Sequence, residues 1–511
     1  MKNLQNFHEH LIHVCAVSKK IKVLLITCIV LLSTTSCFED LDDNASSTKD
    51  INDFVWKAMN ATYAYKDNIA DLANDRFDNS EDYNSYLNDF TTPEALFESL
   101  LYLPDDVDEF SVIVPNYFDL EQILQGTSLQ NGMAFGLIRL SNSTQDVFGY
   151  VRYVMPNSDA DTKGVARGMI FNKIDGTNLT ADNFRSLLSP NTYTLGLANY
   201  DNGGTPDDTT DDSIINTDNE ISLTKSAFTE NPILTHNVIN IDGNSIGYLM
   251  YNGFRFGDSN LTELNNVFAE FQAANVTDLV LDLRYNGGGS VSTAIWLSSM
   301  ITGQYTGEVF FKERWNNSIQ ASLEQSNPDA LVINFTDEMV KRNTNGDITF
   351  QQNINSLNLS KVYILATQST ASASELVING LRPYIDVVHI GLITRGKPQA
   401  SITLYDSENF SREDANPSHT YALQPLVYES ENAAGFAQYY DGLSPNTGFA
   451  IAERYENLGQ LGDPNEPFLA VAIEDITGLG RFFYGETKAL EEIGDNDFDN
   501  ILDKQMIDNR N

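Results

Sequence analysis

Apolar strands alternate with helices along residues 244–399, and this alternation constrains the fold more than any other feature of the sequence. Strands that alternate with helices predict a mixed or largely parallel sheet. The functional residues of such a sheet are expected where its strands end. The pattern runs, in order, through a strand at 244–254, an amphipathic helix at 261–275, a buried strand leading into a glycine loop at 276–290, a helix at 291–302, a strand at 361–367, a helix from about residue 372 and a strand at 387–399.

The N-terminus has the features of an export signal. Three lysines precede ten apolar residues, VLLITCIVLL (23–32), and the small residues STTSC (33–37) follow. Ten apolar residues are too few for a stable membrane span but suit the apolar core of a signal peptide. The small residues before Cys37 resemble the lipobox of bacterial lipoproteins, which implies cleavage after residue 36 and lipid attachment at Cys37. Ordinary signal cleavage without a lipid is the alternative.

The cysteines support the lipid interpretation. Cys15 and Cys28 lie within the predicted signal, so the mature chain would keep only Cys37, at its first position. An exported chain with one cysteine has no internal disulfide. The acidic and polar residues at 37–50 predict a flexible tether. Phe38, rather than an aspartate, follows the cysteine, which favours an exported protein anchored to the outer membrane through its lipid alone.

Two regions precede the α/β pattern. Helical spacing at 51–66 and a capped helix at 91–102 predict an N-terminal helical module. Residues 132–189 resemble a PDZ domain, through a strand ending at Met155–Pro156 and the segment RGMIFNKIDGTNLT (167–180). PDZ domains bind peptide ends by adding them as a strand to the edge of a sheet. A module that only packs as a spacer is the alternative.

The charge of the chain excludes two classes of partner. There are 71 acidic and 31 basic residues, giving a net charge of −40. This balance argues against a nucleic-acid partner and against adsorption to anionic lipid. The segment at 201–220 is polar and acidic, and it predicts a linker at 201–225.

The stretch TASASELVINGL (370–381) allows two interpretations. Ser372 and Glu375 fit a capping box, in which both side chains satisfy helix N-terminal amides. Ser372 also lies just after a strand, where free amides at a helix start can hold an oxyanion. Lys397 ends the next strand, and a lysine can act as general base when its surroundings lower its pKa. A Ser-His-Asp arrangement would need one of the remaining histidines, His236, His389 or His419.

Three segments together resemble the C-terminal processing, or tail-specific, serine proteases: LDLRYNGGG (281–289), STASASE (369–375) and GK (396–397). The resemblance implies a ClpP/crotonase-like core in which Ser372 is the nucleophile and Lys397 the general base. It also implies an oxyanion hole formed by the backbone amides of Gly288 and Ala373.

The third catalytic residue is left open. The family often has a glutamine four residues after the lysine, to orient it, and this chain has Ser401 there. Gln399 is two residues after the lysine and would share its face of an extended strand. Gln399 and Ser401 are therefore both candidates for orienting Lys397.

The predicted function is peptide-bond hydrolysis by acyl transfer. The substrates would be exported polypeptides, cleaved near C-termini that the PDZ-like domain captures, and no metal or cofactor is implied. One alternative is a non-catalytic envelope lipoprotein that keeps the protease fold and binds peptides. Another is a glycan-processing lipoprotein, which would need a pair of carboxylates across a cleft.

The predicted architecture is a multidomain α/β protein. Its parts are a signal peptide at 1–36, an acidic tether at 37–50, a helical module at 51–109, a PDZ-like domain at 110–200, an acidic linker at 201–225 and a mixed α/β protease core at 226–511.

Overall fold

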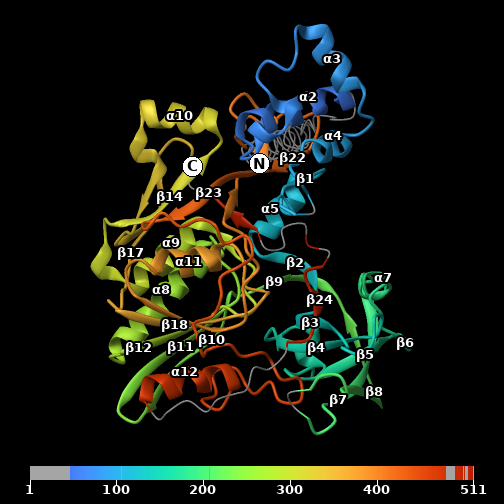
Figure 1. Cartoon of the computed structure of the whole chain (residues 1–511), viewed down its shortest axis with the longest axis vertical. Coiled ribbons are helices and arrows are strands. Elements are labelled where there is room, and N and C mark those ends of the chain that lie inside the picture. Colours follow the sequence, from blue (N-terminus) through green and yellow to red (C-terminus); the bar gives the residue numbers. More distant parts are fainter. Residues whose placement is uncertain are drawn as a thin grey trace, which may run out of the picture. The chain divides into compact units, whose positions relative to one another are not determined.

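A five-stranded sheet with strand order β10-β11-β12-β18-β19 forms the centre of the fold (Figure 1). β10 and β11 form an antiparallel hairpin, and β11, β12, β18 and β19 run parallel. The sheet is therefore mixed, as the alternation of strands and helices predicts. The strands are β10 (Ile233–Ile241), β11 (Asn244–Tyr251), β12 (Asp278–Asp282), β18 (Lys361–Ala366) and β19 (Asp386–Gly391).

Helices cover both faces of this sheet. Leu279 and Leu281 of β12 pack with α8, α9 and α11, whereas Val280 between them packs with α12 on the opposite face. Neighbouring side chains of a strand point to opposite faces, so a strand covered on both sides is apolar throughout. The helices are α8 (Asp258–Ala273), α9 (Val291–Ile301), α11 (Ala373–Leu381) and α12 (Pro467–Thr477).

A second sheet gathers segments that are far apart in the sequence. Its strand order is β13-β25-β20-β23-β14-β15, and it includes residues from near the end of the chain. Its strands are β13 (Gly289–Ser290), β14 (Val309–Trp315), β15 (Val332–Asn334), β20 (Gln399–Ser401), β23 (Leu426–Asn432) and β25 (Met506–Ile507). Further elements around it are α5 (Tyr117–Leu124), α10 (Asn317–Ser326), the hairpin of β16 (Glu338–Arg342) and β17 (Ile348–Asn353), and the small sheet of β1 (Val112–Val114), β21 (Leu404–Tyr405) and β22 (Ala422–Gln424).

A β-rich module is formed mostly by residues that precede the central sheet in the chain, together with β24 from near the end of the chain. Its main strands follow the order β24-β3-β4-β5-β7-β8, and β6 pairs with β5. The elements are β2 (Thr127–Gln130), β3 (Met133–Arg139), β4 (Val147–Val154), α6 (Asp159–Thr162), β5 (Ile170–Ile174), β6 (Thr177–Asn178), α7 (Phe184–Leu188), β7 (Thr192–Asp201), β8 (Ser213–Thr224), β9 (Ser226–Thr229) and β24 (Glu492–Asp495).

The second half of the predicted acidic linker at 201–225 is a strand instead. β8 occupies residues 213–224 and pairs antiparallel with β7. Composition suggested a loop, but Leu223 is buried in the module's core while the acidic side chains of β8, Asp218 and Glu220, are exposed. Charged residues are common on edge strands because they prevent pairing with other chains.

The N-terminal module is helical, as predicted. Thr92 accepts a hydrogen bond from Ala95 N–H, and Pro93 occupies the first turn of α4. Phe54 and Met59 of α2 are buried against α4 and against residues of the small β1-β22-β21 sheet. The helices are α2 (Thr48–Thr62), η2 (Lys66–Asn68), η3 (Ala70–Leu72), α3 (Ser80–Asn88) and α4 (Pro93–Ser99).

The computed structural model describes residues 46–104, 106–205, 208–478, 489–498, 500 and 505–509. The predicted signal peptide, Cys37 and most of the predicted tether lie outside these ranges. Among the described helices, none is long and apolar enough to span a membrane.

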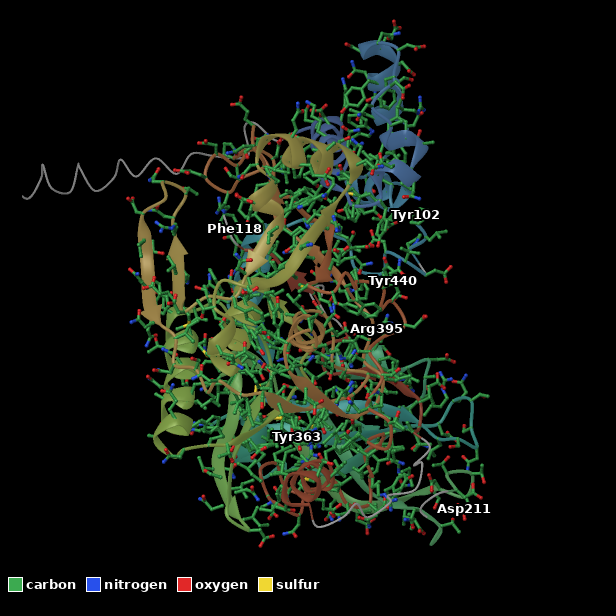
Figure 2. The ribbon with its side chains drawn as sticks, turned by 60° about the vertical axis from the view of Figure 1, so that its left-hand side comes forward. Tyr102, Phe118, Asp211, Tyr363, Arg395 and Tyr440 are labelled. Atoms are coloured by element: carbon green, nitrogen blue, oxygen red, sulfur yellow. The ribbon has the colours of Figure 1, made fainter. Side chains whose placement is uncertain are left out.

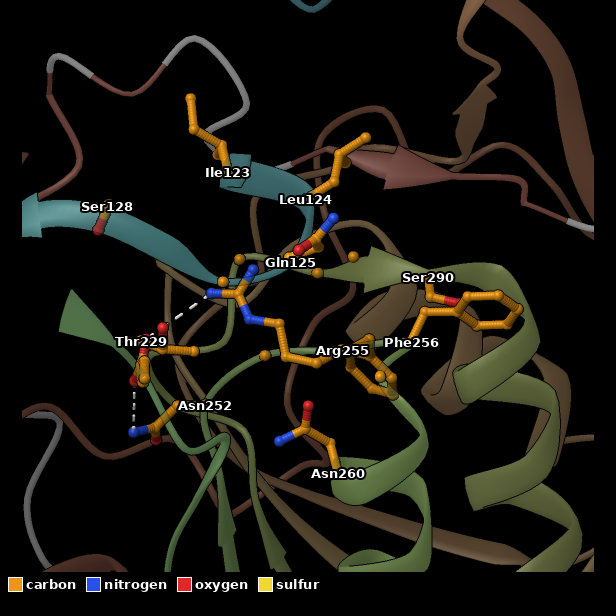
Figure 3. Close-up of a pocket in the computed structure, with 18 of the residues that line it drawn as sticks. Ile123, Leu124, Gln125, Ser128, Thr229, Asn252, Arg255, Phe256, Asn260 and Ser290 are labelled. Atoms are coloured by element: carbon orange, nitrogen blue, oxygen red, sulfur yellow. Dashed lines mark hydrogen bonds and ion pairs between the residues drawn. The ribbon is translucent and has the colours of Figure 1, made fainter. Parts of the chain in front are cut away.

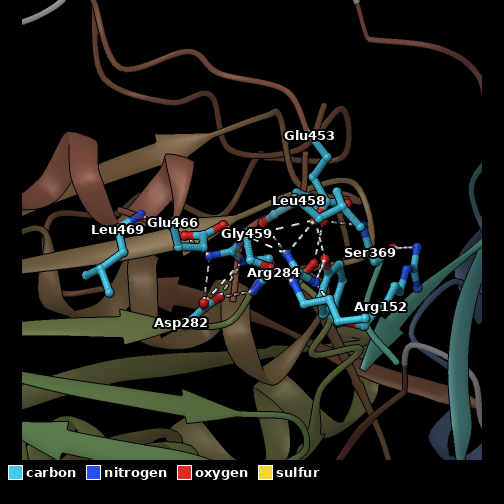
Figure 4. A network of polar contacts seen from close by, with 12 residues as sticks. Arg152, Asp282, Arg284, Ser369, Glu453, Leu458, Gly459, Glu466 and Leu469 are labelled. Carbon is cyan, nitrogen blue, oxygen red and sulfur yellow. Dashed lines mark hydrogen bonds and ion pairs between the residues drawn. The ribbon is translucent and has the colours of Figure 1, made fainter. Parts of the chain in front are cut away.

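A buried ionic network lies at the C-terminal end of β12 (Figure 4). The Arg284 side chain is fully buried and contacts Asp282 at 2.8 Å and Glu466 at 2.6 Å. Glu466 caps α12 by accepting a hydrogen bond from Leu469 N–H. Burial by itself would raise the pKa of Glu466, but the attraction of Arg284 keeps this pKa below its ordinary value. The network thus joins β12 to α12 across the central sheet.

Arg284→Met is expected to destabilise the fold strongly, because Asp282 would stay buried without its cation and Glu466 would keep only the more distant Arg167, at 3.8 Å. The expected loss is about 3–5 kcal/mol of unfolding free energy, measured by equilibrium urea denaturation. Arg314→Met is the matched control, since Arg314 pairs with Glu431 on the surface. That loss should be about 0–1 kcal/mol. Equal losses in the two variants would contradict a structural role for the buried network.

Candidate active site

The turn between β18 and α11 carries Ser372 at the C-terminal edge of the central sheet. Thr370 Oγ1 donates a hydrogen bond to Leu283 O at 2.8 Å, and Ala371 N–H donates to Asn286 O at 3.1 Å. Because β12 and β18 are parallel neighbours, both strands end at this edge. These bonds hold the turn beside the glycine loop that follows β12.

Ser372 occupies a backbone conformation that is unusual for a residue with a side chain. Its φ is +65°, and it immediately precedes the first residue of α11. Such conformations cost about 1–3 kcal/mol and tend to occur at functional sites. The residue is fully buried, and its Oγ has no hydrogen-bond partner among the described residues. The backbone of Ser372 is therefore fixed while its hydroxyl makes no hydrogen bond to the described residues.

The Glu375 carboxylate joins the turn that carries Ser372 to the loop that carries Lys397. Its Oε2 accepts from Ser372 N–H at 2.7 Å and from Lys397 N–H at 2.8 Å. Its Oε1 accepts from Gly396 N–H at 2.7 Å and from Thr394 Oγ1 at 2.5 Å. Burial raises the pKa of Glu375, and these four hydrogen bonds oppose that rise. Glu375 thus accepts the helix N-terminal hydrogen bond predicted for a capping residue, and the same carboxylate also binds the loop that carries Lys397.

Lys397 is fully buried near the turn that carries Ser372. Its Nζ donates a hydrogen bond to Gln505 Oε1 at 2.6 Å. The Phe110 ring covers the same nitrogen, with its centroid 4.4 Å away. One carboxylate oxygen binds the main chains of both Ser372 and Lys397, so the two predicted catalytic residues are close in space although 25 positions separate them in the sequence.

The loop before Lys397 is fixed by its neighbours. Arg395 N–H donates to Thr370 O at 2.9 Å, which ties this loop to the nucleophile turn. Gly396 has a φ of +93°, and a Cβ there would lie 2.1 Å from Tyr440 O. Only glycine fits such a position. Figure 2 labels Arg395 and Tyr440, which lie near each other in this part of the structure.

The glycine loop after β12 packs directly against Ser372. Gly288 has a φ of +115°, and a Cβ there would lie 2.9 Å from Ser372 Oγ. Gly288 N–H donates to Asn286 Oδ1 at 2.9 Å, and Gly289 N–H donates to Gln505 O at 2.8 Å. Ala373 is the first residue of α11, where helical amides lack intrahelical acceptors. The two predicted oxyanion donors, Gly288 and Ala373, are therefore both next to Ser372.

The two candidates for orienting the lysine lie in β20 with different partners. Gln399 Nε2 donates to Tyr65 OH at 2.6 Å, and Ser401 Oγ donates to Gln505 Oε1 at 3.3 Å. Gln505, which the sequence analysis did not identify, binds both Ser401 and Lys397. No local motif marks Gln505, because its position depends on how the end of the chain packs.

A cavity of about 660 Å³ lies beside the glycine loop (Figure 3). The loop and Gln505 line it, together with parts of the β-rich module. Arg255 projects into it and pairs with Glu230 at 3.7 Å, and Asn252 donates to Glu230 at 3.2 Å. Cavities of this size bind small ligands or several residues of a chain. Among the described residues, no group of three or more His, Cys, Asp or Glu side chains is placed to hold a metal.

Comparisons with known proteins point to one family of peptidases. Residues 245–408 match the model for Peptidase family S41, and residues 50–112 match that for the Peptidase S41 N-terminal domain. A solved structure from Bacteroides fragilis, classed as an S41 protease, is 23% identical and covers 84% of this chain and 97% of its own, with a TM-score of 0.61. The photosystem II D1 C-terminal processing protease is 17% identical and covers 83% of this chain and 99% of its own, with a TM-score of 0.43. A comparison with curated proteins finds no match.

Glu375→Gln is expected to disturb the site while keeping the size of the side chain. A glutamine has one acceptor oxygen, so its NH₂ group would face two donors that now bind a carboxylate oxygen. Peptide cleavage should fall by about 100-fold, as expected when the reacting groups shift by about 1 Å. The measurement is kcat/KM on an unstructured protein substrate, with thermal unfolding as a check on the fold. Glu313→Gln, at another buried glutamate, is the control, and an equal loss in both variants would contradict a specific role for Glu375.

Proposed function

We propose that Ser372 and Lys397 form the catalytic dyad of this chain. The chain is a serine-type peptidase whose residues match the models for the N-terminal domain and the peptidase domain of family S41. The observation that carries the proposal is the shared carboxylate oxygen of Glu375, which binds the main-chain N–H of both residues. The unengaged hydroxyl of Ser372 at a helix start supports its role as nucleophile.

The proposed reaction is acyl transfer through the serine. Lys397, as a neutral amine, takes the proton from Ser372 Oγ while that oxygen attacks the carbonyl carbon of the peptide bond. The amides of Gly288 and Ala373 stabilise the resulting oxyanion. For this, Gly288 N–H exchanges its bond to Asn286 for one to the substrate. The lysine then gives the proton to the leaving amine, and water hydrolyses the acyl-enzyme.

The environment of Lys397 supports its role as base. A lysine acts as a general base only when its amine is neutral, and removal from water favours the neutral form. Lys397 is fully buried, and one of the partners of its Nζ, at 2.6 Å, is the uncharged amide of Gln505. A histidine base is less suited here, because burial and Arg382 lower the pKa of His389 to about 4.

The β-rich module is proposed to be PDZ-like and to capture the C-termini of exported polypeptides, and the core is proposed to be ClpP/crotonase-like. Arg152 of this module donates to Ser369 Oγ at 2.9 Å, on the turn that carries the nucleophile. This contact supports communication between the module and the active site. We further propose that the chain is exported and anchored to the outer membrane by a lipid on Cys37.

One observation favours the alternative, a non-catalytic lipoprotein that binds peptides. Ser372 and Lys397 are both fully buried, so a substrate reaches them only after the surrounding segments move. A protein that keeps the fold but never opens the site would bind peptides in the adjacent cavity without cleaving them.

Ser372→Ala and Lys397→Ala are each expected to lower cleavage by about 10⁴-fold or more, as in other enzymes that lose a nucleophile or its base. The assay uses the soluble chain that starts after Cys37 and unstructured proteins with apolar C-termini, with fragments identified by mass spectrometry. His389→Gln is the control and should keep its activity.

The outcomes separate the two functions. Cleavage that survives in Ser372→Ala would identify a different nucleophile. Tight peptide binding with no cleavage by the wild type would support the binding lipoprotein. Substrates with free and with amidated C-termini test end recognition, since a PDZ-like groove should discriminate against the amidated form.

Cys37→Ser is expected to abolish lipid attachment. The full chain, expressed in a Gram-negative host with an alkyne-labelled fatty acid, should carry the label and fractionate with the outer membrane. The serine variant should lose both properties, because the lipid is attached through the thiol. Cys28→Ser is the control, since this cysteine would be removed with the signal peptide. Label that persists in Cys37→Ser would contradict the anchor.

A further inference from the structure

Residues 505–509, here called the C-terminal segment, lie within the second sheet next to the active site. β25 pairs in parallel with β13 on one side and with β20 on the other. Met506 is fully buried in the main core. Asp508 N–H donates to Ser401 O at 2.8 Å, and Ser290 Oγ donates to Asn509 Oδ1 at 2.9 Å. The segment is thus an integral strand between the glycine loop and the strand that follows Lys397.

This packing places the Gln505 amide on the amine of Lys397. Oε1 accepts from Lys397 Nζ at 2.6 Å and from Ser401 Oγ at 3.3 Å, whereas Nε2 donates to Phe110 O at 2.5 Å. These partners fix the orientation of the amide. The reversed orientation would place its oxygen against the carbonyl of Phe110 and its NH₂ group against the donors Lys397 and Ser401.

We propose that Gln505 is the positioning residue for Lys397, supplied by the C-terminal segment. The inference rests on the proposed Ser372–Lys397 dyad. Gln505 touches the lysine amine and not the reacting bond, so it acts through Lys397. The short side chain of Ser401, four residues after the lysine, contacts the Gln505 amide oxygen and shares it with the lysine.

An uncharged amide suits this task. Its oxygen accepts a hydrogen bond from the amine both before and after the lysine takes up a proton, so the geometry holds through the reaction. A carboxylate at the same place would favour the protonated, inactive form of the lysine. The main-chain contact between Gln505 O and Gly289 N–H also fixes the glycine loop, so one residue holds both the base and the loop beside Ser372.

Two substitutions test the proposal in the soluble chain that starts after Cys37. Gln505→Met removes the acceptor at similar size, and kcat should fall by about 100-fold with little change in KM. Gln505→Glu places a negative charge beside the lysine. In this variant the acid limb of the pH profile of kcat/KM should move up by about one to three pH units, because the negative charge favours the protonated lysine. Activity should recover at high pH. Gln424→Met is the matched control, because Gln424 is a buried glutamine in β22 that donates to Thr403.

Failure of this inference is distinguishable from failure of the dyad. If Ser372→Ala and Lys397→Ala abolish cleavage while both Gln505 variants keep the rate and pH profile of the wild type, only the role of Gln505 is overturned. Increased cleavage by Gln505→Met would also overturn it, because the C-terminal segment would then block the site. If Gln505→Met loses both activity and the folded state, Gln505→Glu decides the question, because activity that returns at high pH cannot come from misfolding. A Gln505→Glu variant that is folded but inactive at every pH would overturn the proposal.

Discussion

The active site depends on one buried carboxylate. Glu375 accepts four hydrogen bonds, and two of them come from the main chains of Ser372 and Lys397. A buried charge destabilises a protein unless it is fully hydrogen-bonded. Displacing any of the four donors is therefore unfavourable, and the carboxylate keeps them in place. The loop of Lys397 and the turn of Ser372 follow different strands, and this group fixes the distance between them. It also holds Ser372 in a left-handed backbone conformation that would otherwise relax.

The parallel order of the central strands makes this arrangement feasible. β12, β18 and β19 end at the same edge of the sheet, and each is followed by one part of the candidate site: the glycine loop, the turn that carries Ser372 and the loop that carries Lys397. The ionic network of Arg284 stabilises the same edge from the opposite face by joining β12 to the start of α12. Its neighbour Tyr285 accepts a hydrogen bond from Arg167 of the β-rich module at 2.8 Å, so the loop that approaches Ser372 is connected to that module.

The order of elements in the core follows from the sequence because it depends on local patterns. The strand at 361–366 and the helix from 373 are close to their predicted positions, since apolar runs and capping residues act over a few positions. Local composition was misleading at 213–224, where acidic residues occupy the exposed positions of an edge strand. There the pairing with β7 outweighs a polar composition that is typical of loops.

The sequence alone determined the α/β class, the position of Ser372 just after a strand, and the close approach of the glycine loop at Gly288, because each is encoded within about ten neighbouring residues. The predicted strand at 387–399 was too long: β19 ends at Gly391, and Lys397 lies in the loop between β19 and β20. Only the tertiary structure decided what surrounds these residues. From the sequence, Glu375 could have acted only as a helix cap. Gln399 and Ser401 were both candidates for contacting Lys397. The contact that Gln505 makes with Lys397 spans 108 positions of the chain. Such a contact exists only when a distant segment pairs as a strand, and no local pattern of side chains records that pairing.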